Sequence, residues 1–199
     1  MSEAIFTLHY LPSISYFAEL LSAEQFLLER QDNFQKASFR NRTIINTANG
    51  PMILSIPLQG GRDKHQRYAD VKISYATNWQ KQHWQSIRSA YGSAPFFEHY
   101  ARFFHPFYEK EFAFLYEFNL ALLEKILQLL KQKRELIFTE TYSFFSPISN
   151  DSRSETFEEK IKTIKPYIQV FSERYGFNPN VSVLDLLFCE GPNAMNYLL

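Results

Sequence analysis

The chain has 199 residues, of which 45% are hydrophobic and 17% aromatic, and its 21 lysines and arginines balance 21 aspartates and glutamates. This length suits one globular domain with a full core, and the aromatic content argues against disorder. A net charge of zero provides no overall field to attract nucleic acid or an anionic membrane. We therefore expect a single domain over residues 1–199 that does not bind nucleic acid.

Cysteine content and the absence of long apolar runs indicate the compartment. Cys189 is the only cysteine, which excludes an intrachain disulfide and a cysteine-based zinc site. Residues 1–10 lack the basic start and apolar run of a secretory signal, and no stretch of the chain is long and apolar enough for a membrane span. These features predict a cytoplasmic protein without a membrane span.

The N-terminal segment predicts a strand, a helix and a second strand. Residues 4–8 form an apolar run that leads to Pro12, a residue suited to the first turn of a helix. A helix is expected to begin at Ser13 or Pro12, and residues 25–29 predict the second strand. Such a unit buries both faces of a sheet best as a parallel pair with a right-handed crossover, which favours an α/β fold.

A polar loop, a hairpin and a mobile segment are expected next. Residues 31–41 are polar and show no apolar period. Two β-rich runs, residues 42–46 and 52–57, flank an Asn-Gly pair that is typical of a hairpin. Residues 59–67 combine paired glycines with mixed charges, which predicts a mobile loop.

The rest of the chain is predicted to be mainly helical. Helices are expected over residues 77–91, 95–104 and 107–132. They are followed by a strand at 135–139, a loop at 143–153, a strand at 167–171 and a helix at 182–189. The predicted architecture is therefore α/β, with a small mixed or mostly parallel sheet, a β-hairpin and a helical middle section.

Short blocks of residues follow one another in a characteristic order along nearly the whole chain. Those of the first part are Tyr10-Leu11-Pro12, Tyr16-Phe17, Glu29, residues 33–42 and Asn49-Gly50. Those of the later part are Asn78-Trp79-Gln80, His83-Trp84, Ala90-Tyr91, Pro95-Phe96-Phe97-Glu98, Lys165-Pro166-Tyr167 and Glu190-Gly191-Pro192. In order and spacing these blocks resemble the WbqC-like family, in the form common among Bacteroidetes.

The resemblance implies a role. The family is named after a protein of O-antigen gene clusters, which implies a transferase of surface polysaccharide biosynthesis that adds an acyl or aminoacyl group to an amino sugar. A sugar nucleotide or an acyl donor is then the implied small-molecule partner. The chain departs from the commoner family opening, because Phe6-Thr7-Leu8 stands where a His-Gln-Pro triplet is usual. His9 is the candidate to replace that histidine.

The loop after the second predicted strand is the strongest candidate site. Glu29 ends that strand, and Lys36, Arg40, Asn41 and Arg42 follow it. In open α/β sheets ligands bind beyond the carboxyl ends of strands, and arginine holds phosphate or carboxylate groups bidentately. The pattern predicts an anion-binding site; the alternative is a solvated loop or a set of structural ion pairs.

Two histidines are candidate proton acceptors. His83 shares a helical stripe with Tyr91, so it can act as a general base if that stripe borders a pocket. A buried structural histidine is the commoner alternative. His9 precedes the proline start of a helix, where imidazole and helix amides can meet an anion. Tyr10 and Tyr91 belong to the family blocks beside these histidines and are counted as ligand-binding candidates.

Residues near the C-terminus have both functional and structural interpretations. Asp151 and Arg153 either complete a pocket or pin their loop by an ion pair. Asp185 is expected to accept amide hydrogen bonds near a helix start, and Cys189 to pack in the core. The aromatic segment 96–108 has a single lysine or arginine, Arg102, among its aromatic residues, which argues against a base-stacking platform.

Absent motifs narrow the function further. No histidine spacing typical of zinc sites occurs, so no metal is expected, and no cofactor is assigned. Glycine-rich phosphate loops, serine-hydrolase elbows and kinase signatures are also missing. Two hypotheses remain. In the first, a glycan transferase holds its anionic substrate with Lys36, Arg40 and Arg42 and uses His83, His9 or Glu29 for proton transfer. In the second, the protein is a non-catalytic metabolite-binding or protein-interaction module.

Overall fold

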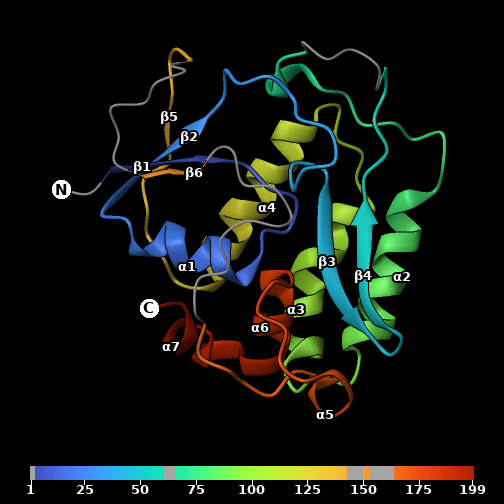
Figure 1. The fold of residues 1–199 in the computed structure, drawn as a ribbon. Coiled ribbons are helices and arrows are strands. Elements are labelled where there is room, and N and C mark those ends of the chain that lie inside the picture. The colour runs from blue at the N-terminus through green and yellow to red at the C-terminus, as the bar shows by residue number, and fades with distance from the viewer. Residues whose placement is uncertain (1–2, 61–65, 143–149, 153–163) are drawn as a thin grey trace.

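The computed structural model describes residues 3–60, 66–142, 150–152 and 164–199. Its main sheet is parallel, with the strand order β5-β2-β1-β6 (Figure 1). The strands are β1 (Glu3–Thr7), β2 (Gln25–Glu29), β5 (Ile137–Phe138) and β6 (Asn150–Ser152). Because Thr7 pairs with Glu29, β1 and β2 end at the same edge of the sheet.

The predicted strand-helix-strand unit is confirmed. Helix α1 (Ile14–Ser22) joins β1 to β2, and the two strands are parallel. Ser13 begins the helix, because its hydroxyl accepts a hydrogen bond from the Tyr16 amide at 3.2 Å. The side chains of Ile14 and Phe17 are fully buried, so α1 contributes an apolar face to the core.

The predicted hairpin is also present. It consists of β3 (Arg42–Thr47) and β4 (Gly50–Ser55), which pair antiparallel from Arg42 with Ser55 to Thr47 with Gly50. Gly50 has a φ of 99°, in the left-handed region that glycine adopts without steric cost. The hairpin lies beside α2 (Figure 1).

The predicted continuous helix over 107–132 is wrong, because residues 109–114 are not helical. The middle section contains η1 (Tyr68–Asp70), α2 (Trp79–Tyr91), α3 (Phe97–Phe104), η2 (His105–Tyr108) and α4 (Leu115–Leu129). Before α4 the backbone pairs with a distant segment: Ile73 N–H donates to the Ala113 carbonyl, and Leu115 N–H donates to the Val71 carbonyl at 2.9 Å. These long-range hydrogen bonds override the local helical pattern.

The C-terminal segment forms the base of the molecule. Its elements are α5 (Ser172–Tyr175), α6 (Val183–Glu190), η3 (Gly191–Asn193) and α7 (Met195–Leu198). The strand predicted at 167–171 is wrong. No strand is formed there; instead, the side chain of Gln169 binds the backbone of Asn178. It donates to the Asn178 carbonyl at 3.0 Å and accepts from the Asn178 N–H at 2.8 Å.

Two further predictions concern loops. Residues 150–152, predicted as part of a loop, form β6 beside β1. Residues 61–65 of the predicted mobile segment, residues 143–149 and Arg153 lie outside the described residues. Among the helices that the structure describes, none has the length and apolar character needed to cross a membrane.

Candidate functional site

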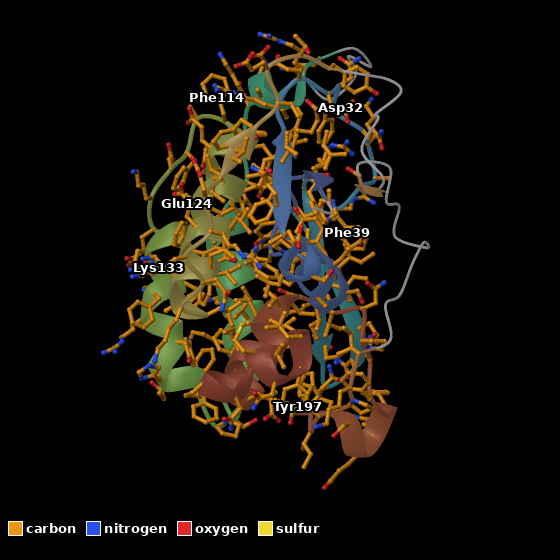
Figure 2. The ribbon with its side chains drawn as sticks, turned by 90° about the vertical axis from the view of Figure 1, so that its left-hand side faces the viewer. Asp32, Phe39, Phe114, Glu124, Lys133 and Tyr197 are labelled. Atoms are coloured by element: carbon orange, nitrogen blue, oxygen red, sulfur yellow. The ribbon has the colours of Figure 1, made fainter. Side chains whose placement is uncertain are left out.

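A group of mostly buried polar side chains lies around the carboxyl ends of β1 and β2, and we call it the edge cluster. Its members are Thr7, His9, Glu29, Asp32, Arg40, Tyr68, Tyr116, Asn119 and Thr139. Figure 2 shows Asp32 and Phe39, from the loop that supplies Arg40, on the opposite side of the molecule from Glu124 and Lys133. The cluster combines residues from β1, β2, the 31–41 loop, η1 and α4.

Arg40 is the central cation of the edge cluster and is only 1% exposed. One terminal nitrogen donates to an Asp32 carboxylate oxygen at 2.5 Å and lies 3.5 Å from the Thr7 hydroxyl. Arg40 Nε has no hydrogen-bond partner among the described residues. Since buried polar groups in native proteins are nearly always paired, this nitrogen is available to a ligand or to water.

Tyr68 and Asn119 hold the Arg40 loop in place. The Asn119 side-chain amide donates to the Arg40 carbonyl at 2.7 Å and to the Tyr68 hydroxyl at 2.6 Å. Tyr68 in turn donates to the Leu8 carbonyl at 2.9 Å. Burial raises the pKa of the Tyr68 phenol, which keeps it protonated for this hydrogen bond.

His9 lies in the same cluster and is 3% exposed. Its ring stacks on Phe39 at 5.4 Å and lies 4.5 Å from the Tyr16 ring. Burial, followed by the charge of Arg40, lowers the pKa of His9 to about 3, so the imidazole is neutral near pH 7. His9 Nδ1 has no partner among the described residues, which leaves a second unfilled position in the cluster.

Glu29 is fully buried at the end of β2. Its Oε1 accepts from the Gln31 N–H at 2.6 Å and from the Thr139 hydroxyl at 2.7 Å. Thr139 follows β5, so the carboxylate is held between two adjacent strand ends. The charge of Glu29 also acts on Tyr116, whose pKa is raised mainly by burial.

The other predicted loop residues have different positions. The Asn41 side-chain amide donates to the Ile56 carbonyl at 3.0 Å and so ties the loop to the hairpin. Lys36 is exposed, and Arg42 is half-buried on β3. The contacts recorded between described residues join neither Lys36 nor Arg42 to the edge cluster. Asp151 lies in β6, paired with Ile5.

His83 and Tyr10 form a separate hydrogen-bonded chain. The Tyr10 hydroxyl lies 2.9 Å from His83 Nδ1 and 2.9 Å from the Tyr108 hydroxyl. Burial lowers the pKa of His83 to about 4, and the Ser55 backbone partly opposes this effect. The His83 ring also meets Trp79 edge to face at 5.1 Å. These contacts are those of a buried, satisfied histidine.

A second polar cluster surrounds Asp185, and we call it the Asp185 cluster: Asn46, Tyr91, Tyr167, Gln169 and Asp185. Asp185 Oδ1 accepts from the Tyr167 hydroxyl at 2.5 Å and from the Gln169 amide at 3.0 Å. Burial raises the pKa of Asp185 to about 6, although these hydrogen bonds and those with Tyr91 and Asn46 lower it.

The expectation that Asp185 accepts amide hydrogen bonds at a helix start is corrected by the structure. The N-cap of α6 is Ser182, whose hydroxyl accepts from the Leu184 N–H at 3.2 Å, whereas Asp185 receives its hydrogen bonds from distant side chains. Cys189 is 7% exposed, and burial raises the pKa of its thiol. It is therefore a packing residue, as expected.

Tyr68 and Asn119 are members of the edge cluster that the sequence did not reveal. Asn119 carried a usable signal, since it is a polar residue inside the apolar pattern of α4, and it is fully buried. Tyr68 carried none, because it lies in a short turn beside a polar segment.

The fold and the edge cluster define a small α/β protein whose parallel sheet carries buried charged groups at its carboxyl edge. A model of the WbqC-like protein family matches residues 8–153, and the chain belongs to this family. The chain is also similar to a protein of Mycobacterium tuberculosis named Uncharacterized protein Rv1507c, with 26% identity in an alignment 226 positions long that covers 98% of this chain and 96% of that protein. No solved structure matches the chain significantly.

Proposed function

We propose that this protein is a group-transfer enzyme of surface polysaccharide biosynthesis, with its active site at the edge cluster. Its substrates would be a sugar nucleotide and an acyl or aminoacyl donor. The observation that carries the proposal is that two buried nitrogens, Arg40 Nε and His9 Nδ1, have no hydrogen-bond partner among the described residues. Both lie beside strand ends, where α/β proteins bind ligands.

The chemistry of these side chains assigns their roles. Arg40, oriented by Asp32, binds a phosphate or carboxylate of the substrate through its free nitrogen. Acyl transfer to an amine requires a group that removes a proton from the attacking nitrogen, and His9 and Glu29 are the candidates. An anion bound to Arg40 would offset the charge that helps to lower the pKa of His9. Lys36, exposed on the same loop, can reach charged parts of the substrate nearer the surface.

Isothermal titration with sugar nucleotides and with acetyl-coenzyme A, as a model acyl donor, tests the site. Arg40→Lys keeps the charge opposite Asp32 but removes Nε, so we expect affinity to fall roughly tenfold, the effect of losing one charged hydrogen bond. Arg67→Lys is the matched control, because Arg67 forms an exposed ion pair with Asp70 at 2.9 Å. Equal binding by the folded Arg40→Lys variant would overturn the assignment.

A binding function without catalysis is the second candidate. The observation that favours it is the lowered pKa of both His9 and His83, about 3 and about 4, which makes each a weak base in the free protein. Mass spectrometry of the mixture of protein, sugar nucleotide and acyl donor distinguishes the two. An enzyme returns an acylated sugar nucleotide, whereas a binding module returns both ligands unchanged.

A further inference from the structure

A groove of about 450 Å³ runs between α2 and α3, and no member of the edge cluster lines it. One wall carries Lys81, Trp84 and Arg88 of α2. Their spacing of three and four residues places them on one face of the helix. The other wall includes Phe97 and Arg102 of α3. A groove of this size lies within the range of small-molecule sites.

The floor of the groove is aromatic. Trp84 is half-buried, and its ring is held by three other rings in nearly parallel or tilted orientations. The centroid distances are 6.4 Å to Phe97, 5.6 Å to Tyr108 and 4.9 Å to His105. The indole is therefore fixed, and its remaining exposed surface lines the groove.

The rim of the groove is basic. Lys81, Arg88 and Arg102 are all exposed, and Glu98 is the acidic residue among the lining side chains. Neither Lys81 nor Arg88 forms an ion pair with another described residue. Because the whole chain has no net charge, this local excess of cations makes the groove a preferred place for an anion.

We propose that this groove binds a nucleoside phosphate. The base stacks on Trp84, and Lys81, Arg88 and Arg102 hold the phosphates. Stacking of a base on an aromatic side chain stabilises its binding, and arginine pairs bidentately with phosphate oxygens. The sequence argued against such a platform, because Arg102 is the only lysine or arginine in segment 96–108. In the fold, the other two cations, Lys81 and Arg88, come from α2, which lies across the groove from this segment.

Tryptophan fluorescence tests the site, because the chain has two tryptophans and only Trp84 lines the groove. Trp79 is 2% exposed. Titration with UDP and ADP at low salt should quench the emission in a saturable way. Trp79→Phe should keep the quenching and Trp84→Phe should abolish it. Inorganic pyrophosphate should compete with the nucleotide without quenching.

Charge variants complete the experiment. Arg88→Gln combined with Arg102→Gln should weaken binding at least roughly tenfold, and both side chains are exposed, so the fold is retained. Arg67→Gln is the control. The proposal is overturned by unsaturable quenching, by unchanged affinity of the double variant, or by failure of pyrophosphate to compete. It is also overturned if Arg40→Lys abolishes quenching, since the nucleotide would then bind at the edge cluster. The groove does not depend on the proposed function, because Arg40→Lys tests one site and the double variant tests the other.

Discussion

The edge cluster contains a buried ion pair and two nitrogens without a hydrogen-bond partner among the described residues, one in the His9 ring and one in the Arg40 guanidinium group. The Asp185 cluster contains one buried carboxyl group surrounded by neutral donors. Both are almost inaccessible to solvent. In the Asp185 cluster, side chains from β3, α2, the 167–169 segment and α6 meet at one carboxyl group. A network of this kind joins segments of the fold. In the edge cluster the atoms without a partner among the described residues include Arg40 Nε and His9 Nδ1, whereas in the Asp185 cluster such an atom is the carboxyl oxygen Oδ2 of Asp185. The edge cluster therefore offers a buried cationic donor to an anion, and the Asp185 cluster offers an acceptor.

Arg40→Met is expected to have the largest effect on stability. It leaves the Asp32 carboxylate buried without its cation, and loss of one partner from a buried pair costs about 3–5 kcal/mol. Arg67→Met is the matched control. Arg67 and Asp70 are 59% and 50% exposed, so loss of that pair should cost less than about 1 kcal/mol. Urea denaturation of the two variants measures both free energies of unfolding.

A double variant sharpens the same comparison. Asp32→Leu together with Arg40→Met removes both charges, so part of the stability lost in the single variant should return. If Arg40→Met alone costs no more than Arg67→Met, the buried pair is not the centre of the edge cluster.

Asp185→Asn tests the neutral cluster through pH. The pKa of Asp185 is raised to about 6 from an ordinary value of 3.8, so the folded state holds its proton more tightly than the unfolded state. Its contribution to stability is therefore full below about pH 4 and is lost as pH rises through about 6. The difference corresponds to about 3 kcal/mol. In Asp185→Asn this loss should disappear.

Thermal or urea unfolding of wild type and Asp185→Asn at a series of pH values checks this expectation. Asp70→Asn is the control, because it makes the same chemical change at a carboxyl group that is half exposed. If the difference in free energy of unfolding between wild type and Asp185→Asn does not change between about pH 4 and pH 7, burial does not raise the pKa of Asp185, and the description of this cluster is contradicted.

Local sequence signals predicted the first part of the fold well. The strand at 25–29 has the predicted bounds, and Ser13 begins α1 as expected, since each rests on a nearby pattern of apolar, proline or hydroxyl residues. The helix over 107–132 failed for a different reason. Backbone hydrogen bonds of Ala113 and Leu115 with Ile73 and Val71 decide the start of α4. These partners lie some forty residues away, so the local sequence does not indicate them.

The candidate site shows the same division. Glu29 was predicted because it ends a strand and Arg40 because it lies in the loop after that strand, and the structure places both near the carboxyl ends of β1 and β2. Lys36 belongs to the same predicted loop but is exposed, because a loop sequence does not indicate which side chains turn inward. His83 lies in a buried chain with Tyr10 and Tyr108, which depends on residues far apart in the sequence.

His9→Phe should show a pH effect of the opposite sign to that of Asp185→Asn. The pKa of His9 is lowered to about 3 from an ordinary 6.5, so the unfolded state binds the proton more readily and stability is lost as pH falls below about 6.5. Between about pH 6.5 and pH 5 this loss amounts to about 2 kcal/mol. Phenylalanine retains the stacking on Phe39 but does not titrate, so the variant should lose less stability than wild type over this interval. Urea unfolding at pH 8 and pH 5 measures the difference; equal losses in both proteins would mean that His9 is not held neutral.

Two tyrosine variants, one in each cluster, provide the finest comparison. Tyr167→Phe removes a donor to Asp185, and a hydrogen bond to a charged group contributes about 1.5–3 kcal/mol. Because Asp185 ionises near pH 6, this cost should be larger at about pH 8 than at about pH 5. Tyr68→Phe removes a donor to the neutral Leu8 carbonyl and an acceptor for the neutral Asn119 amide, so its cost of about 1–2 kcal/mol should be the same at both pH values. Equal pH dependence of the two variants would show that the carboxyl group in the Asp185 cluster does not change its charge in this range, and that the two clusters differ less than their hydrogen bonds indicate.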